Sequence, residues 1–402
     1  MDTIKSSDLI LNNLRVIKLL GKGAMGTVFL VHDIFHDPSA LSPFALKAVD
    51  KSNFSSNAIH RRALWETTLL SRLQHPFLPT LIGFTENSDF ICYAVPYCPG
   101  GDLNVLRYTQ SDHVFSPSAI RFYLAEIVLA LEYLHTLGIA YRDLKPENVL
   151  IQQSGHVTLT DFDLSTTLTP KKNLEFYSDP ENNDILSTQS QPQTFKFSKF
   201  AKSMVKCKSN ARNGLRKVKS ARVSPVSRRN RSSFYERSNS FVGTEEYVAP
   251  EIIRGEGHEF SVDWWALGIL CYEMLYGTTP FKGKNRKETF RRILMTEPEF
   301  IGRKNDLADL IGKLLEKDPT RRLGYRRGAS EVKEHEFFRG MKWDRLTEVV
   351  RPPFLPLRDV TEEEKKGGIT ITEYFQKLKA PPSPLWSPSH DEWTNNISLT
   401  EF

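Results

Sequence analysis

Over the first hundred residues, apolar and polar positions follow mostly the short period of β-strands. Strand-like runs cover 14–20, the segment VFLVHD after a glycine-rich turn, PFALKAV, 81–84 and Phe90–Pro96. Between the third and fourth runs, residues 58–73 repeat their apolar positions with helical spacing. The pattern predicts a small β-rich lobe with one main helix.

Beyond the Pro/Gly-rich joint PYCPGGDL, the spacing becomes helical. A long amphipathic helix is predicted over 118–137, with Ser116 as its cap and Pro117 at its first position. Three more helices are predicted, over 263–276, 287–295 and 307–317. The predicted fold class is therefore α+β, with a small β-rich lobe followed by a large α-helical lobe.

Composition is that of an ordinary globular chain: 402 residues, 40% hydrophobic and 25% charged. No apolar run approaches the roughly 20 residues of a membrane-spanning helix, and the polar N-terminus is not typical of a secretory signal. The cysteines, Cys92, Cys98, Cys207 and Cys271, are widely spaced, which favours free thiols in a reducing compartment.

Charge is concentrated in one segment. The net charge is +6, but 194–237 holds fourteen Lys or Arg and one acid, a local net charge of +13, which leaves about −7 for the rest. This segment lies in a polar stretch, 166–233, without periodicity, interpreted as a disordered insertion. The stretch after about residue 331, with RPPFLP and PPSP, suggests an extended tail along a folded body.

The insertion admits three interpretations: a solvated loop, a membrane-surface patch or a nuclear import signal. Lysines alternate with apolar side chains, which suits an anionic lipid surface. The runs KVKSAR and SRRNR suit nuclear import, and no direct nucleic-acid binding is expected. The apolar members of the patch are Phe195, Phe197, Phe200, Met204 and Val205.

The first chemical motif is the GxGxxG string of Gly21–Val28. Alone it is weak, since ordinary glycine hairpins and dinucleotide-binding folds also show it. Strand-like sequence flanks it on both sides, and a lysine, Lys47, follows at the distance where a dinucleotide fold has an acid. This context favours a lid over a triphosphate, with Lys47 as a fixed positive charge and Glu66, on the next helix, as its partner.

The segment YRDLKPEN is far more specific. Asp143 can accept the proton of a substrate hydroxyl, Lys145 can offset charge on a γ-phosphate, and Asn148 can ligate Mg²⁺. Asp161, in the triplet Asp161-Phe162-Asp163 after a strand-like run, is the expected second ligand. The alternative is a turn with scattered charges. Pairing of Glu251 with Arg322, and hydrogen bonds from Asp263 to the catalytic loop, are expected to be structural.

Together these motifs, with APE at 249–251 and DWWALG at 263–268, occur in the order that protein kinases show. YRD in place of HRD, the run SFVGTEEYVAPE and a tail with FF and PPF resemble the AGC group. Asp163 where most kinases have glycine, together with the basic insertion, resembles the plant AGC VIII subfamily, which includes the PINOID and UNICORN-type kinases. The resemblance covers the chain from about residue 14 to its end.

This resemblance implies a Mg²⁺-dependent serine/threonine protein kinase that uses ATP, with protein substrates. The implied domains are an N-terminal extension (1–13), an N-lobe (14–95), a C-lobe (96–338) containing the insertion 166–233, and a C-terminal tail (339–402). The implied catalytic residues are Asp143, Lys145, Lys47 and Glu66, and the implied metal ligands are Asn148 and Asp161. The implied ATP-site residues are Leu20, Gly21, Lys22, Gly23, Ala24, Met25, Gly26, Thr27, Val28, Ala45, Lys47, Val95 as gatekeeper, Tyr97, Cys98 and Asp102.

By the same resemblance, Asp102 and Glu147 read basic substrate residues, and Lys145 with the sequence at 243–244 matches the Ser/Thr pattern. Ser240 matches an activation-loop phosphosite held by Arg142, and Ser238 is a second candidate; plain surface serines are the alternative. An upstream activating kinase is a further partner, although the final Leu399-Thr400-Glu401-Phe402 has leucine where relatives carry phenylalanine, which favours autophosphorylation.

Asp163 lacks the freedom of glycine at positive φ, which suggests a stiffened metal-binding turn. A monomer in cytoplasm and nucleus is expected, with peripheral plasma-membrane association through 194–237 as an option. The rival interpretations are a pseudokinase scaffold and a lipid-binding regulator acting through the insertion. His135 is expected to be a packed helix histidine rather than a ligand.

Overall fold

The computed structural model describes residues 7–23, 26–34, 43–53, 57–110, 112–168, 244–257, 259–348, 352–354 and 369–379. The chain divides into two compact units, and all described residues belong to the one formed by Met1–Thr169 and Glu236–Phe402. Several predictions fall outside the described residues: Ala24, Met25, Ser238, Ser240, Leu399 to Phe402 and nearly all of the insertion, including its apolar patch.

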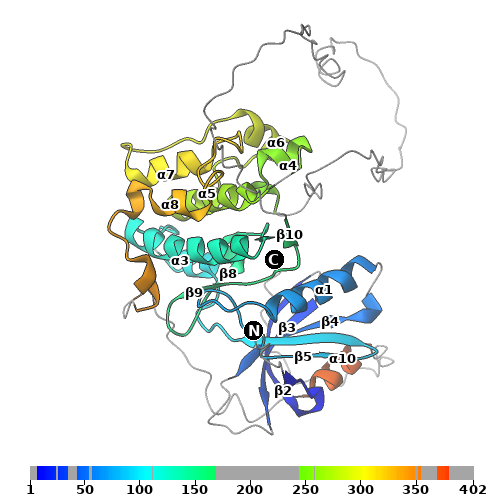
Figure 1. Ribbon diagram of the computed structural model, residues 1–402. Helices are drawn as coiled ribbons and strands as arrows, with labels where there is room; N and C mark the ends of the chain where they lie inside the picture. The colour runs from blue at the N-terminus through cyan, green and yellow to red at the C-terminus, as the bar shows by residue number, and fades with distance from the viewer. Residues whose placement is uncertain are drawn as a thin grey trace, which may run out of the picture. The chain divides into compact units, whose positions relative to one another are not determined.

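A six-stranded sheet forms the small lobe (Figure 1), in the order β1-β5-β6-β4-β3-β2. Only β1 and β5 run parallel; the other neighbours are antiparallel. All the strands predicted in this lobe are present, although the fourth begins at Gly83 rather than residue 81. The bounds are β1 Ser7–Asp8, β2 Leu14–Gly23, β3 Gly26–Asp33, β4 Phe44–Asp50, β5 Gly83–Glu86 and β6 Phe90–Pro96.

Two helices cover opposite faces of this sheet. Helix α1 (Asn57–Leu70) packs through Ala63 against Ile91 of β6, whereas α10 (Ile371–Lys379) packs through Phe375 against Phe90. Since successive side chains of a strand point to opposite faces, the two helices lie on different sides. Helix α1 confirms the predicted main helix, ending at Leu70 instead of residue 73.

Helix α10 corrects the interpretation of the tail as wholly extended. Ile371, Tyr374 and Phe375 recur at helical spacing, and the first and last of them are buried in the lobe core with Phe29. Tyr374 meets Phe29 edge-on at 4.9 Å between ring centroids. This apolar stripe is what makes a helix on the sheet more favourable than an extended strap.

The large lobe is built around α3 (Pro117–Thr136) and α5 (Ser261–Tyr276) (Figure 1). Most side chains of α5 and about half of those of α3 are buried. Ser116 accepts a hydrogen bond from the Ala119 amide, and Pro117 takes the first helical position, as predicted. The other helices are α2 Leu103–Tyr108, α4 Pro250–Arg254, α6 Arg286–Met295, α7 Asp306–Leu314 and α8 Ala329–Lys333.

Helix α7 is shorter than predicted. Residues 307–317 were expected to be helical, but α7 ends at Leu314. Asp318 precedes Pro319, a position at which helical backbone is disfavoured, so the helix stops a few residues before it.

Two short antiparallel pairs complete the site region: β7 (Ile139–Ala140) with β10 (Thr166–Thr167), and β8 (Val149–Ile151) with β9 (Val157–Leu159). The 3₁₀ segments are η1 Leu11–Asn13, η2 Lys51–Asn53, η3 Pro146–Asn148, η5 Glu245–Tyr247, η6 Glu336–Phe338 and η7 Trp343–Glu348, the last of which is kinked at Arg345. Within the described part of the chain, no helix is long and apolar enough to cross a membrane.

Candidate active site

The lysine of β4 lies at the centre of the site. Lys47 Nζ is 2.9 Å from Glu66 Oε2 on α1 and 3.0 Å from Asp161 Oδ1 after β9. Burial alone would lower the pKa of Lys47, but Glu66, Tyr93 and Asp161 outweigh it and hold that pKa well above its usual range. The expected pair with Glu66 is therefore present, and the ammonium stays charged.

The loop between β7 and β8 carries the acceptor of the predicted chemistry. Asp143 Oδ2 accepts hydrogen bonds from Lys145 Nζ at 3.0 Å and from the Asn148 amide nitrogen at 2.8 Å. Burial raises the pKa of Asp143, and Lys145 opposes the rise. One carboxylate oxygen is thus held by the loop itself, which orients the other for a substrate hydroxyl.

Asp263, on α5, holds this loop from below. Its Oδ1 accepts a hydrogen bond from the Arg142 amide at 2.7 Å. Its Oδ2 accepts one from the Tyr141 amide at 2.9 Å and lies 2.8 Å from His135 Nε2. Arg142 adopts a left-handed conformation, with φ of 70°, which these bonds stabilise. The predicted roles of Asp263 as an anchor and of His135 as a packed side chain agree with these contacts.

Asn148 and Asp161 fit a hard divalent cation. Both hydrogen bonds of the Asn148 side chain use its amide nitrogen, which leaves the amide oxygen for a ligand role. Asp161 is 39% exposed and uses one oxygen for Lys47. Among the described residues, no group of three or more His, Cys, Asp or Glu is arranged to hold a metal ion.

The predicted nucleotide residues gather on the sheet beside Lys47. Hairpin β2–β3 pairs Gly23 with Gly26, and a Cβ on Gly26 would lie 2.6 Å from the Ala48 carbonyl oxygen, so only glycine allows this close approach. Ala45 pairs directly with Val95, placing both at the end of the sheet that leads to Tyr97 and Cys98. Of the other predicted members, Thr27 is buried, Leu20 and Lys22 are exposed, and Gly21 and Val28 are half-buried.

On the substrate side, Asp102 caps α2 by accepting a hydrogen bond from the Val105 amide at 2.8 Å, and Glu147 is exposed. Lys145 Nζ also reaches Thr244 Oγ1 at 3.2 Å, which brings together the two segments of the predicted Ser/Thr pattern. Burial raises the pKa of Asp102, and the backbone hydrogen bonds that its carboxylate accepts only partly oppose the rise.

Sequence reasoning missed an acid beside these two. Glu273 of α5 accepts a 2.5 Å hydrogen bond from the Tyr247 hydroxyl and lies 3.4 Å from the Arg107 guanidinium. Burial raises its pKa, and Glu147 is close enough to contribute to the rise. Glu273 lies five residues beyond the DWWALG motif of α5, so the available signal was its charge in an otherwise apolar helix.

Asp163 stands where most kinases have glycine. Positive φ among described non-glycine residues occurs at His113, Arg142 and Asp161, so Asp163 does not occupy the region that glycine would open, and the stiffened turn stays a prediction. Asp163 is buried and lies 3.8 Å from Arg62 of α1. Burial, with the nearby Asp161 carboxylate, raises its pKa to about 6.

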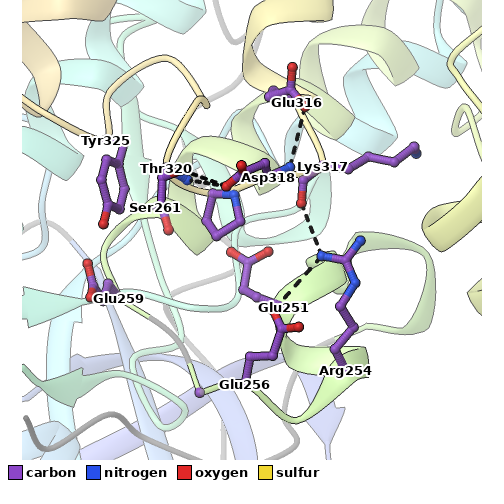
Figure 2. A pocket seen from close by; sticks show the side chains of 12 residues that line it. Glu251, Arg254, Glu256, Glu259, Ser261, Glu316, Lys317, Asp318, Thr320 and Tyr325 are labelled. Carbon is purple, nitrogen blue, oxygen red and sulfur yellow. Dashed lines mark hydrogen bonds and ion pairs between the residues drawn. The ribbon is translucent and has the colours of Figure 1, made fainter. Parts of the chain in front are cut away.

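A hollow among the described residues lies apart from this site, in the large lobe. A cavity of about 560 Å³ opens between α4, the start of α5 and the loop 316–320 (Figure 2). Its wall includes more carboxylates than cations, which would repel a nucleotide triphosphate. Beside it, Arg322 makes a bidentate pair with Glu251 at 2.7 and 2.9 Å, as predicted. The charged residues of the wall are Glu251, Glu256, Glu259, Glu316, Asp318, Arg254 and Lys317.

Comparison with known proteins agrees with this geometry. Residues 14–189 and 226–338 match the protein kinase domain family. The serine/threonine-protein kinase UCN of Arabidopsis thaliana is 58% identical over 94% of each chain, and UCNL of the same plant is 57% identical over 95% of this chain and 94% of its own. Arabidopsis OXI1, also a serine/threonine-protein kinase, is 46% identical over 89% of this chain and 82% of its own.

Proposed function

Since this chain belongs to the protein kinase family, among serine/threonine kinases of the plant AGC VIII group, we propose that it transfers the γ-phosphate of ATP to serine or threonine in basic sequence contexts. The family implies use of ATP and Mg²⁺. The pseudokinase alternative is not favoured, because the relatives are named serine/threonine-protein kinases and the chain keeps Lys47, Asp143 and Asp161.

One observation carries the proposal: Lys145 Nζ donates hydrogen bonds to both Asp143 and Thr244, and the Lys47–Asp161 pair lies nearby. Asp143 would accept the hydroxyl proton as the substrate oxygen attacks phosphorus. Lys145 would bind the transferring phosphoryl group, whose charge it offsets.

Asn148 and Asp161 would hold Mg²⁺, which neutralises triphosphate charge when bound. Lys47, kept charged by Glu66, would orient the phosphates under the β2–β3 hairpin. Ala45, Val95, Tyr97 and Cys98 would enclose the base.

Preference for basic substrates is supported by three acids on the same side of the large lobe. Asp102 and Glu147 were predicted for this role, and Glu273 adds a third carboxylate within electrostatic reach of Glu147. An arginine side chain would match these oxygens through paired N–H donors.

Control by phosphorylation of Ser240 is proposed from a pair of arginines. The pKa of Arg142 is lowered mainly by burial, and Asp263 opposes this effect. The charge of Arg62 lowers the pKa further, which means that the guanidinium groups of Arg62 and Arg142 are close enough to repel each other. Two such groups would bind a phosphate.

We further propose Ser238 as a second phosphosite, an upstream activating kinase, and contact of residues 194–237 with anionic lipid. Vesicle flotation with and without anionic lipid tests the lipid contact.

Transfer of labelled phosphate from Mg-ATP to an arginine-rich serine peptide tests the function. We expect Asp143→Asn to abolish transfer, because Asn cannot accept the proton. Asp344→Asn, at a carboxylate that is 82% exposed, is the matched control and should keep full activity. Wild-type protein that transfers no phosphate, even after treatment with an activating kinase, would contradict the proposal.

A further inference from the structure

Helix α1 contacts the metal-binding loop 161–165 at several places besides the Lys47–Glu66 pair. Glu66 Oε1 accepts a 3.0 Å hydrogen bond from the Phe162 amide. One residue earlier, Trp65 donates its indole N–H to Ser165 Oγ at 2.9 Å. One turn further back, Arg62 faces Asp163. Three residues of α1 therefore contact three residues of the loop.

The Trp65 contact continues into the loop backbone. Ser165 is only 7% exposed, and its hydroxyl donates a 2.6 Å hydrogen bond to the Phe162 carbonyl oxygen. The backbone amide of Ser165 donates to that same oxygen at 3.1 Å. Trp65 therefore fixes the hydroxyl that holds the carbonyl of Phe162, while Glu66 holds its amide.

These contacts leave both peptide groups of Phe162 attached to α1. The peptide on its N-terminal side joins it to Asp161, which has a left-handed backbone with φ of 58°. For a non-glycine residue this conformation persists only when its surroundings hold it. Rotation of the peptide between Asp161 and Phe162 would change ψ of Asp161 and displace its carboxylate from Lys47, and holding the next peptide limits the adjustment of Phe162 that such a rotation needs.

Each acid of the loop faces its own cation. Asp161 lies 3.0 Å from Lys47, and Asp163, only 8% exposed, lies 3.8 Å from Arg62. Two carboxylates two residues apart repel each other, so contacts from α1 favour the single arrangement in which each carboxylate keeps its cation.

We propose that Trp65 is a positioning residue for the metal ligand Asp161, acting through Ser165, so that α1 and the metal-binding loop hold one arrangement together. This rests on the proposed function, in which Asp161 binds Mg²⁺. Neither Trp65 nor Ser165 touches the reacting groups, and neither belongs to the motifs found in the sequence.

Trp65→Phe and Ser165→Ala test the proposal, because each removes one group of the relay while keeping most of the packing. Thr68→Ala is the matched control, since the Thr68 hydroxyl bonds only to the Leu64 carbonyl within α1. For each protein we would measure phosphotransfer as a function of Mg²⁺ and, separately, binding of a fluorescent ATP analogue with and without Mg²⁺.

Trp65→Phe should need roughly fivefold more Mg²⁺ for half-maximal rate and lose a similar factor in Mg²⁺-dependent nucleotide binding, as expected for one lost hydrogen bond. Ser165→Ala, which removes two, should show at least as large an effect. Metal-free nucleotide binding and the KM for peptide should stay unchanged. Combining the two substitutions should cost no more than one of them, because they interrupt the same relay.

Relay variants that match Thr68→Ala in Mg²⁺ dependence would overturn the proposal, as would strictly additive effects in the double variant. The binding measurement keeps this decision separate from the proposed function. An inactive wild type would refute phosphotransfer, whereas the Mg²⁺-dependent part of nucleotide binding would still decide the role of Trp65.

Discussion

Replacing Arg322 by methionine should destabilise the large lobe strongly. The guanidinium is 1% exposed and makes two hydrogen bonds to Glu251, one to the Ser261 carbonyl at 2.9 Å and one to the Glu316 carbonyl at 2.9 Å. Methionine fills similar volume but leaves the Glu251 carboxylate buried without its partner. Breaking a buried pair in this way costs about 3–5 kcal/mol of unfolding free energy.

The double variant Arg322→Met/Glu251→Leu separates the charge from the packing. With both charges removed, only two backbone carbonyls lose a partner, at about 1 kcal/mol each, so the double variant should be more stable than Arg322→Met alone. The cavity of Figure 2 adjoins Glu251 and can admit water, which favours the lower end of the range for the single variant.

Urea denaturation followed by tryptophan fluorescence is the assay, because Trp265 lies 5.1 Å from the guanidinium and reports on this part of the core. Arg321→Met, one residue away with a side chain that is 73% exposed, is the control and should cost under about 0.5 kcal/mol. A single variant as stable as wild type, or a double variant less stable than the single, would refute the reasoning.

Three further predictions concern stability elsewhere. Burial lowers the pKa of His75 from 6.5 to about 4, so its contribution to folding stability is full above pH 6.5 and is lost as the pH falls toward 4. Allowing for partial exposure, we expect this contribution to be about 1–2 kcal/mol. The variant His75→Gln should therefore show a flatter pH dependence of thermal unfolding, and an unchanged slope would count against this. Gly26→Ala should lower stability by about 1–3 kcal/mol, because its Cβ would meet a β4 carbonyl at 2.6 Å, whereas Gly21→Ala has open space; equal melting temperatures would contradict this. Phe375→Ala should cost about 3 kcal/mol by exposing the sheet core under α10, against no measurable change for the exposed Gln376→Ala in the same calorimetric scan.

Much of the fold follows from local pattern. Strands of the small lobe alternate because one face of each packs against α1 and the other against α10, and the cap at Ser116 is a local hydrogen bond. Helix α10 was missed because its apolar stripe is short and lies between Pro-rich segments. Its stability comes from Phe29 and Phe90, residues more than 280 positions away in sequence.

The same distinction applies to the site. The motifs that contain Lys47, Asp143 and Asp161 have a residue spacing that is enough to predict the chemical role of each. Glu273 and Trp65 act through partners that the fold alone supplies, so no local spacing marks them. Asp163 was noticed, but its backbone conformation and its contact with Arg62 depend on how α1 lies over the loop.

The position of α10 also bears on how the protein is made. About 350 residues separate Phe29 from Phe375, and ribosomes add ~5–20 residues per second, so roughly 20–70 s pass between the synthesis of the two. During that time one face of the small lobe's sheet is covered by α1, while its other, apolar face is open to solvent. A nascent chain of this kind is a natural client for chaperones, and messages truncated before residue 369 would yield a lobe that never closes.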